Sequence, residues 1–401
     1  MATPTGFKFL YNSVQTDFAD VFDTTTPGSI TTGYKSAAYG NLDLGQIFTA
    51  GNSGISTSYK YSTNIDLGSI FKQGGIPVIT TPTYCYKQAI ISWTNTDTPN
   101  FYILYQNGIP ISNSATSPYT DLNLTNGATY TYTVAAVYSS TTLTSDPFIS
   151  NQPATQTYFL GNFTTTTDAT NTYLQFSALG TSTLTYNCST AINNASVLIV
   201  GGGGGGGGGF SSSTGAAGGG GGGGGEVNNV SPLTINNSTI SVIVGSGGGG
   251  GVFGQNGSSG TLSSIVGTST YTANPGGGGQ KGTSGGGSQG GAGGSQGGIN
   301  TTAGGNGGQG QFTGANGENS AYYNSTSNKY SGGGGGGAFA ILGGAGGDGV
   351  GGAGAGGSTT QNGGLGISYG GGGGGSSALI NLNSGSGGAG RQGIVIFTIP
   401  N

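Results

Sequence analysis

The sequence contains no histidine and few charged residues of either sign. Of its 401 residues, 8 are Lys or Arg and 12 are Asp or Glu, which gives a formal net charge of −4. A protein that binds nucleic acid neutralises phosphates with clustered basic groups, and so few cannot form a basic stripe. Acid–base and nucleophilic catalysis need titratable groups poised beside a partner, and the carboxylates are dispersed. We therefore expect neither a nucleic-acid partner nor an enzymatic activity.

Sequence motifs for metals and cofactors are missing as well. No group of potential ligands has the spacing of a metal site. The nearest approach to a phosphate-binding loop, residues 279–283, lacks both the Lys-Ser/Thr dipeptide and a preceding strand. Matches to G-x-G-x-x-G carry no information in a chain with 93 glycines. We expect no cofactor.

Cysteines and long apolar runs are also scarce. The only cysteines are Cys85 and Cys188, which excludes a disulfide framework. A single bridge would have to join two predicted domains, and we do not expect one to form. No run approaches the roughly 18 apolar residues of a membrane span. The start, Met1 to Val14, lacks a basic cap followed by a hydrophobic stretch. We expect neither membrane insertion nor conventional secretion.

Glycine dominates the second half of the chain, whereas larger apolar residues are frequent up to about Val200 and sparse afterwards. Hydrophobic residues make up 32% of the whole, which is below the usual apolar share. The two halves must therefore be stabilised by different interactions.

Residues 1–75 contain a short internal repeat. Its pattern is an aromatic residue and Lys, a spacer, and then Asp-apolar-small-x-β-branched-Phe. The three copies are Phe7-Lys8 with 17–22, Tyr34-Lys35 with 43–48, and Tyr59-Lys60 with 66–71. The first half of each unit predicts a short strand, and the Asp predicts the N-cap of one helical turn.

A unit this small cannot bury its apolar residues alone, which leaves two interpretations. The copies stack on one another as a small domain, or their turns dock onto another protein. The pattern resembles short tandem motifs at the N-termini of surface proteins of large double-stranded DNA viruses, which implies docking onto capsid proteins. The docking residues would be Phe22, Ile47, Phe48, Ile70 and Phe71.

Residues 76–153 show the alternation of a β-sandwich. Strands are expected at 89–93, 101–105 and 130–137, separated by turn sequences such as 106–108 and 125–127. This region resembles a fibronectin type III domain, with a Trp in the second strand and Leu124 six residues before a Tyr, as in the tyrosine corner of that family. The resemblance implies a core that includes Trp93, Tyr130, Tyr132 and Val134.

Residues 154–401 alternate strands with glycine tracts. Strands are expected at 173–176, 196–200, 240–244 and 393–399, and uninterrupted glycine occupies 201–209 and 218–225. Disordered tails normally carry charge and do not end in an aliphatic strand. The last strand needs a partner, and Val197 to Val200 is the natural one.

Glycine tracts of this kind can form a bundle of polyproline II-type helices. Such a helix has three residues per turn, rises about 3.1 Å per residue, and makes no internal hydrogen bonds. Without side chains, neighbouring helices can approach closely enough to pair their backbone groups. Fixing glycine costs much backbone entropy, so we expect the bundle to form cooperatively on the flanking strands.

The glycine-rich half closely resembles the glycine-rich domain of phage and giant-virus tail or fibre proteins. The features that carry the resemblance are Val197–Val200 running into glycine, Glu226-Val227 after a glycine tract, Val242–Gly248, and the terminal Gly390–Phe397. In related bundles of phage adhesins, loops at the bundle tips contact receptors.

Aromatic residues interrupt the glycine tracts and are candidates for binding. Flat aromatic faces suit contact with sugars or proteins; alternatively, these residues plug the ends of the bundle. The longest insert, 311–331, is the preferred tip loop. Its candidate receptor-contact residues are Phe312, Tyr322, Tyr323, Lys329 and Tyr330.

Together these patterns predict a mostly β protein with little α-helix. It comprises N-terminal repeats (1–75), a fibronectin III-like sandwich (76–153), and a β scaffold carrying polyglycine II helices (154–401). The resemblances imply a fibre or spike, assembled in the host cytoplasm and displayed on the virion surface. It would contact capsid proteins and a host glycan or protein receptor, and analogy with other fibres implies a trimer. The alternatives are a coat or cement protein without a receptor role, and an ice-binding protein.

Overall fold

The computed structural model describes residues 8–11, 14–17, 75–139, 141–213, 215–283, 316–317, 330–338, 345–346, 353, 361–380, 382 and 384–401. Structural statements below refer to these residues. Within them the chain is mostly β, as predicted, and the only helical element is the short 3-10 helix η2 (Thr155–Tyr158). No helix in the described part is long and apolar enough to cross a bilayer.

A short hairpin stands at the N-terminus. β1 (Lys8–Tyr11) pairs antiparallel with β2 (Val14–Asp17), and Lys8 lies opposite Asp17. The strand expected at the aromatic-Lys element is therefore present in the first repeat. The predicted docking residues all lie outside the described residues; they are Phe22, Ile47, Phe48, Ile70 and Phe71.

The described chain divides into two compact units. The first contains the described residues up to Pro82 together with Ile90–Thr120 and Tyr130–Ser150. The second contains Thr83–Ala89, Asp121–Thr129 and Asn151–Asn401.

Residues 75–151 form short antiparallel strands. They are β3 (Val78–Ile79), β4 (Thr83–Cys85), β5 (Gln88–Ile91), β6 (Trp93–Thr94), β7 (Phe101–Gln106), β8 (Ile109–Ala115), β9 (Tyr119–Leu122), β10 (Thr129–Val137), β11 (Thr142–Thr144) and β12 (Phe148–Asn151). One sheet has the order β11-β10-β7-β8, with β12 also on β10; others are β4-β5-β9 and β3-β6. Asn107 and Gly108 both have positive φ, as the tight β7–β8 turn requires.

The core of the first unit agrees with the sequence prediction except at one position. Trp93, Tyr132 and Val134 are buried, and the Trp93 ring meets the ring of Tyr102 edge-on at 5.5 Å. Tyr130 is only half-buried. It points to the same side of β10 as Tyr132, but it lies near the start of the strand, where fewer neighbours cover it.

The second unit contains two five-stranded antiparallel sheets, with the orders β13-β16-β21-β22-β23 and β14-β15-β24-β17-β20. Their strands are β13 (Phe159–Gly161), β14 (Thr164–Thr167), β15 (Asn171–Phe176), β16 (Gly180–Tyr186), β17 (Ile192–Val200), β20 (Val227–Ile235), β21 (Ser238–Val244), β22 (Ser263–Val266), β23 (Thr270–Ala273) and β24 (Ile394–Pro400). β24 pairs with β17, Val200 lying opposite Ile394. The partner predicted for the last strand is confirmed.

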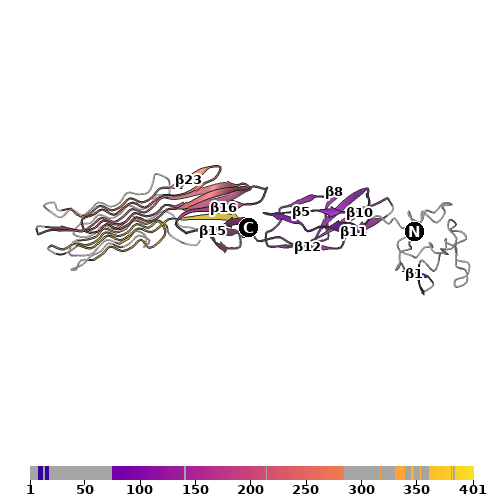
Figure 1. Ribbon diagram of the computed structural model, residues 1–401, viewed down its shortest axis with the longest axis horizontal. Coiled ribbons are helices and arrows are strands. Elements are labelled where there is room, and N and C mark those ends of the chain that lie inside the picture. The colour runs from indigo at the N-terminus through magenta and orange to yellow at the C-terminus, as the bar shows by residue number, and fades with distance from the viewer. Residues whose placement is uncertain are drawn as a thin grey trace, which may run out of the picture. The chain divides into compact units, whose positions relative to one another are not determined.

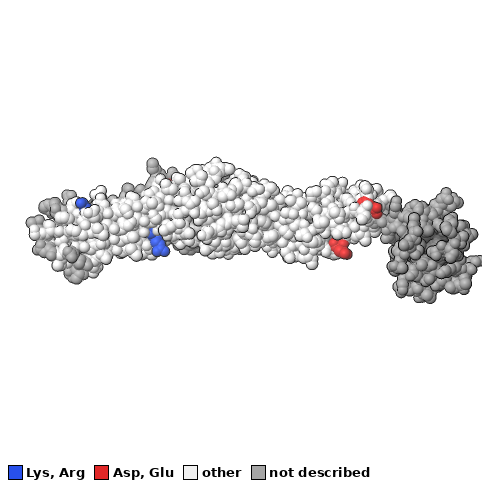
Figure 2. Space-filling model, viewed as in Figure 1, with Lys and Arg blue, Asp and Glu red and all other residues white. Residues whose placement is uncertain are grey.

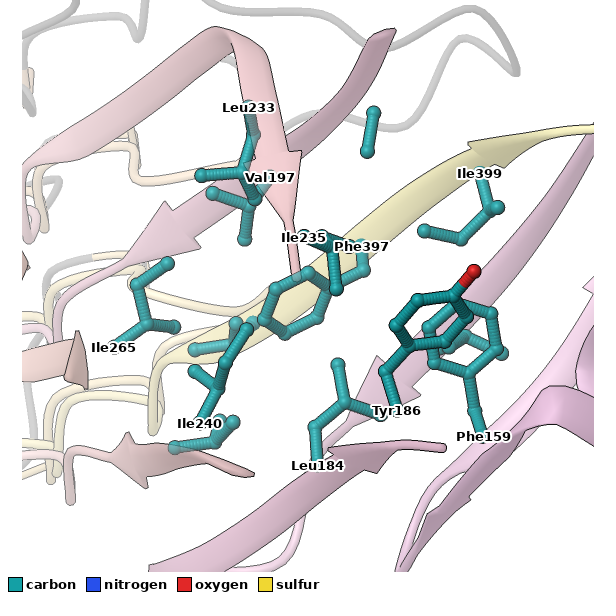
Figure 3. Packing of buried hydrophobic residues seen from close by; sticks show 14 of the residues in the cluster. Phe159, Leu184, Tyr186, Val197, Leu233, Ile235, Ile240, Ile265, Phe397 and Ile399 are labelled. Carbon is teal, nitrogen blue, oxygen red and sulfur yellow. The ribbon is translucent and has the colours of Figure 1, made fainter. Parts of the chain in front are cut away.

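One large hydrophobic core joins these two sheets (Figure 3). β15 alternates strictly, with Leu174 and Phe176 buried, as expected for a strand with one face toward a core. Each fully buried side chain of this size stabilises the fold by about 1.5–3 kcal/mol. Residues from both sheets that Figure 3 labels are Phe159, Leu184, Tyr186, Val197, Leu233, Ile235, Ile240, Ile265, Phe397 and Ile399.

A smaller cluster covers the other face of β17 and β24. It contains Leu198, Val200, Ile394 and Ile396, and Tyr330 packs there with only 4% of its surface exposed. These two strands are thus buried on both faces, which is why they read as continuous apolar runs. The prediction that Tyr330 contacts a receptor is wrong, because its ring is used to close this cluster.

The two cysteines form a disulfide. Cys85 and Cys188 are bonded with their Cα atoms 5.4 Å apart, contrary to the sequence expectation. Strand β4, which carries Cys85, belongs to the second compact unit together with Cys188. The bridge therefore lies inside one unit and does not join two domains.

Candidate functional site: a glycine bundle and its far end

Extended glycine-rich segments continue directly from the strands of the second unit. Residues 201–209 follow β17, residues 245–251 follow β21, and residues 384–391 lead into β24. The segments run side by side away from the sheets (Figure 1). The strands therefore fix where each segment begins.

Residues 201–209, called the central helix below, donate hydrogen bonds in a strict repeat of three. The N–H groups of residues 201, 204 and 207 donate to the carbonyls of 226, 223 and 220 on one neighbouring segment. Those of residues 202, 205 and 208 donate to the carbonyls of 261, 258 and 255 on a second segment. Those of residues 203, 206 and 209 donate to the carbonyls of 391, 388 and 385 on a third segment. The donor–acceptor distances run from 2.7 to 3.4 Å. A repeat of three residues is that of a polyproline II-type helix.

The carbonyls of the central helix accept in the same rhythm from three further segments. The N–H groups of residues 248, 251 and 254 donate to the carbonyls of 203, 206 and 209. Those of residues 276, 279 and 282 donate to the carbonyls of 202, 205 and 208. Those of residues 373 and 376 donate to the carbonyls of 204 and 207. The helix thus has six hydrogen-bonded neighbours, and all its N–H groups are paired, as are the carbonyls of 202–209. A helix with no internal hydrogen bonds is in this way fully satisfied.

Side chains are excluded from the interior of this lattice. A Cβ built on Gly205 would lie 2.1 Å from the carbonyl oxygen of Gly249, and one on Gly206 would lie 2.1 Å from that of Gly374. Such contacts are with backbone, which cannot rotate away. Glycine is needed here because the helices approach one another too closely for any side chain.

A buried carboxylate lies where the bundle meets the sheets. Glu226 is 2% exposed, and its Oε2 accepts hydrogen bonds from the backbone N and the Nδ2 of Asn274, at 2.8 and 2.9 Å. Its backbone carbonyl accepts from Gly201 N. Glu226 therefore ties together the sheet-side ends of three glycine segments, and its place at the end of a glycine tract is the signal noted in the sequence.

At the ends of the segments away from the sheets, bulky apolar side chains are exposed. We call Phe210, Val252, Phe253, Ile380 and Leu382 the far-end patch; the exposed fractions of the last four lie between 44% and 61%. Phe210 follows the central helix and stacks on Phe253, with ring centroids 6.2 Å apart and planes 14° apart. Phe210 and Phe253 thus bring two segments distant in the sequence together, and Ser211 Oγ donates a hydrogen bond to Leu379 O, next to Ile380.

The sequence-predicted contact residues have different outcomes. Phe312, Tyr322, Tyr323 and Lys329 lie outside the described residues, and Tyr330 is buried against the sheet. Among the other aromatic inserts, Tyr369 packs on the cluster around Tyr330, whereas the Phe210–Phe253 pair lies at the far end.

Sequence reasoning missed the aliphatic members of the far-end patch, namely Val252, Ile380 and Leu382. Their signal was available, because Val252 directly follows a glycine tract, and Ile380 and Leu382 lie in the short insert between two glycine-rich segments, outside any alternating strand. Such a residue cannot enter the bundle and must lie outside it.

The side chains exposed at the far end are suited to binding through apolar contacts. Within the described residues no three His, Cys, Asp or Glu side chains lie close enough together to hold a metal ion. On the face drawn in Figure 2, charged side chains are few and scattered. Flat rings and aliphatic groups beside Ser and Asn suit binding to a surface that is itself weakly charged.

Comparison with protein families gives one match. The model of a family described as a glycine-rich domain matches residues 177–400. This range begins beside β16 and includes the whole bundle and the closing strand β24. A search of curated proteins found no match.

Proposed function

Because the chain belongs to the glycine-rich domain family, we propose that it is a structural protein of a virus surface, a fibre or spike. Its N-terminal repeats attach it to capsid proteins, and its glycine-rich domain is displayed at the particle surface. The protein is assembled into particles in the host cytoplasm, and its role on the particle involves no catalysis.

The observation that carries this proposal is the fully hydrogen-bonded central helix. A glycine chain is normally the most flexible of linkers, and here each of its N–H groups is held by a neighbour. A rigid bundle can hold a binding surface at a fixed distance from its sheets, which a flexible tether cannot do. The nine residues of 201–209 span about 28 Å at the rise of this helix type.

We propose that the displayed surface contributes to host attachment. The far-end patch, with Phe312, Tyr322, Tyr323 and Lys329 as further candidates, would contact a host-cell glycan or protein receptor. Exposed Phe and aliphatic side chains held on rigid backbone lose little entropy on binding. A trimer, the usual form of fibres, would present several copies of the surface together and so increase avidity.

The fibronectin type III-like region would act as a spacer. The sheet orders β11-β10-β7-β8 and β4-β5-β9 support this likeness, since domains of that architecture consist of two antiparallel sheets. Buried Trp93 in the strand after β5 supports it further.

Attachment to the capsid is tested by removing residues 1–75 from the protein encoded by the virus. We expect particles to lose the truncated chain while its thermal unfolding remains cooperative. A second variant substitutes Phe48 and Phe71 by Ser in the full chain, which changes only two of the predicted docking residues and should also reduce incorporation. Normal incorporation of both variants would contradict the anchor role.

Host attachment is tested by competition with the purified full chain. We expect wild-type protein to block attachment of particles to host cells, and Phe253→Ser with Ile380→Ser to block it at least tenfold less well. Leu365→Ser is the control, because this side chain is 66% exposed but lies on a lateral segment. If wild-type protein does not compete, the coat or cement function is favoured instead.

A further inference from the structure

The outer segments of the bundle pair by a recurrent two-bond arrangement that we call a clasp. In a clasp, one residue donates its N–H to the carbonyl of a residue on the adjacent segment. A side-chain oxygen from the same residue, or from an Asn just before it, accepts the N–H of that second residue. The second bond is needed because adjacent carbonyls in this helix point to different neighbours.

Hydroxyl clasps join residues 245–251 to residues 255–262. Ser258 N donates to Gly249 O at 2.9 Å, and Gly249 N donates to Ser258 Oγ at 2.7 Å. One turn along, Thr261 N donates to Ser246 O at 2.9 Å, and Ser246 N donates to Thr261 Oγ1 at 2.7 Å. The same geometry therefore repeats at a spacing of three residues.

Asparagine clasps have the same form on other segments. Gly363 N donates to Ser386 O at 2.9 Å while Ser386 N donates to Asn362 Oδ1 at 2.8 Å. In the second asparagine clasp, Gly317 N donates to Ala345 O at 2.9 Å, and Ala345 N donates to Asn316 Oδ1 at 2.8 Å. An Asn-Gly dipeptide supplies both atoms of the clasp.

On residues 275–283, one row of backbone N–H groups, at every third residue, is either paired with a side-chain oxygen or absent. Lys281 N donates to Asn256 Oδ1 at 2.8 Å, and Gly278 N donates to Ser259 Oγ at 3.4 Å. The next position in the row is Pro275, which has no N–H. An Asn, a Ser and a Pro thus have the same effect, which is that no N–H group in this row is left unpaired.

Stability alone does not account for these bonds. The clasps at Gly249, Ser246, Ser386 and Ala345 are exposed, where water would pair the same N–H groups at little cost. An unpaired row has another consequence, because its donors would recur every three residues, about 9.3 Å apart at the rise of this helix. That is the spacing offered by the carbonyls of any further glycine helix.

We propose that the clasps close the lateral faces of the bundle against a glycine helix from a second copy of this chain. β-Sheets face the same problem at their edge strands, which natural proteins blunt with side chains, Pro and bulges. Here Ser, Thr, Asn and Pro occupy the equivalent positions. The inference concerns the sides of the bundle and is independent of what its far end binds.

The test replaces Ser258 and Thr261 by Gly in the full chain. Both acceptors are removed, so the N–H groups of Ser246 and Gly249 become free beside positions 258 and 261, which no longer carry a side chain. In sedimentation velocity, we expect the weight-average mass to rise with concentration toward twice the wild-type value. Hydrogen exchange at Gly249 and Ser246 should be at least tenfold faster than in wild type at low concentration, and should slow as the mass rises.

Two matched variants separate this mechanism from general destabilisation. Ser258→Ala with Thr261→Ala also removes the acceptors but keeps a Cβ on the face, so exchange should accelerate while the mass stays at the wild-type value. Gln255→Gly removes an exposed side chain outside the clasps and should change neither. Asn362→Gly opens a different face and should repeat the mass increase if the first variant folds poorly. Faster exchange without any mass increase in the Gly variants, or an equal increase in the Ala variant, would overturn the proposal.

Discussion

A single methyl group placed in the central helix should disrupt the bundle. In Gly205→Ala the Cβ would lie 2.1 Å from Gly249 O and 2.4 Å from Gly249 C. Ordinary contact begins at 3.4 Å, so the helices must separate locally by 3.4 − 2.1 = 1.3 Å. The hydrogen bond from Gly205 N to Ser258 O, now 2.9 Å long, lies beside this displacement and cannot keep its length.

The cost can be estimated from two effects. Forcing a methyl into a close-packed interior costs about 1–3 kcal/mol, and leaving one or two buried backbone groups unpaired costs about 1–3 kcal/mol each. Ala also restricts the unfolded chain, which offsets up to about 1 kcal/mol. We expect a net loss of roughly 2–5 kcal/mol, a large part of the 5–15 kcal/mol typical of a domain. At about 2–4 °C per kcal/mol, the melting temperature should fall by roughly 4–20 °C.

Differential scanning calorimetry and amide hydrogen exchange on the full chain measure this effect. The matched control is Gly249→Ala, whose Cβ would meet only Ser258 Oγ, at 3.6 Å, and whose stability should stay within about 0.5 kcal/mol of wild type. In wild type, the amides of residues 202–208 should be protected nearly as strongly as those of β17. Equal melting temperatures for the two Ala variants, or rapid exchange throughout 202–208 in wild type, would refute a rigid bundle.

Three further predictions concern the sheets and their junctions. Cys188→Ser opens a disulfide that closes a separation of 103 residues and should cost about 2–5 kcal/mol; an unchanged melting temperature would contradict a structural role for the bridge. Glu226→Ala removes both hydrogen bonds to Asn274 and should cost roughly 1.5–3 kcal/mol in urea unfolding, whereas an unaltered midpoint would mean that the carboxylate is dispensable. The Tyr173 hydroxyl and nearby backbone N–H groups lower the pKa of Asp168 to about 2 from its usual 3.8. This carboxylate therefore stabilises the fold above pH 3.8, and its contribution is lost as the pH falls toward 2. Tyr173→Phe should raise the pKa of Asp168 in an NMR titration, and no change would argue against that hydrogen bond.

Much of the second unit could be predicted from the sequence. The pairing of the last strand with Val197–Val200 followed from the need of an aliphatic strand for a partner, and the structure has that pairing. The glycine bundle followed from the absence of charge and side chains in tracts bounded by strands. Both arguments depend on the residue pattern within a short segment, which can be read directly from a single sequence.

The predictions that failed were those that depended on assigning a segment to one region. Cys85 was assigned to the sandwich domain, but its strand belongs with the second unit, so the disulfide was not expected. Tyr330 was assigned to an exposed loop, but it packs on the outer face of the β17–β24 pair. Neither contact leaves a periodic signal, because each joins residues far apart in the chain.

The composition of each segment reflects which positions of its three-residue repeat face the backbone of a neighbour. The central helix has close neighbours on every side, so all three positions of its three-residue repeat must be glycine, and 201–209 is uninterrupted. In residues 245–251, Gly247 and Gly250 face one neighbour, and Gly245, Gly248 and Gly251 face another; a Cβ at any of these would lie between 1.9 and 2.3 Å from backbone.

The third position of that repeat is open, and it carries Ser246, Gly249 and Val252. Residues 255–262 face inward only at Gly257 and Gly260, and their other two positions carry side chains. The repeat positions restricted to glycine are therefore those that face the backbone of a close neighbour. Interruptions of the glycine tracts, which resemble random low-complexity variation, follow from the place of each segment in the lattice.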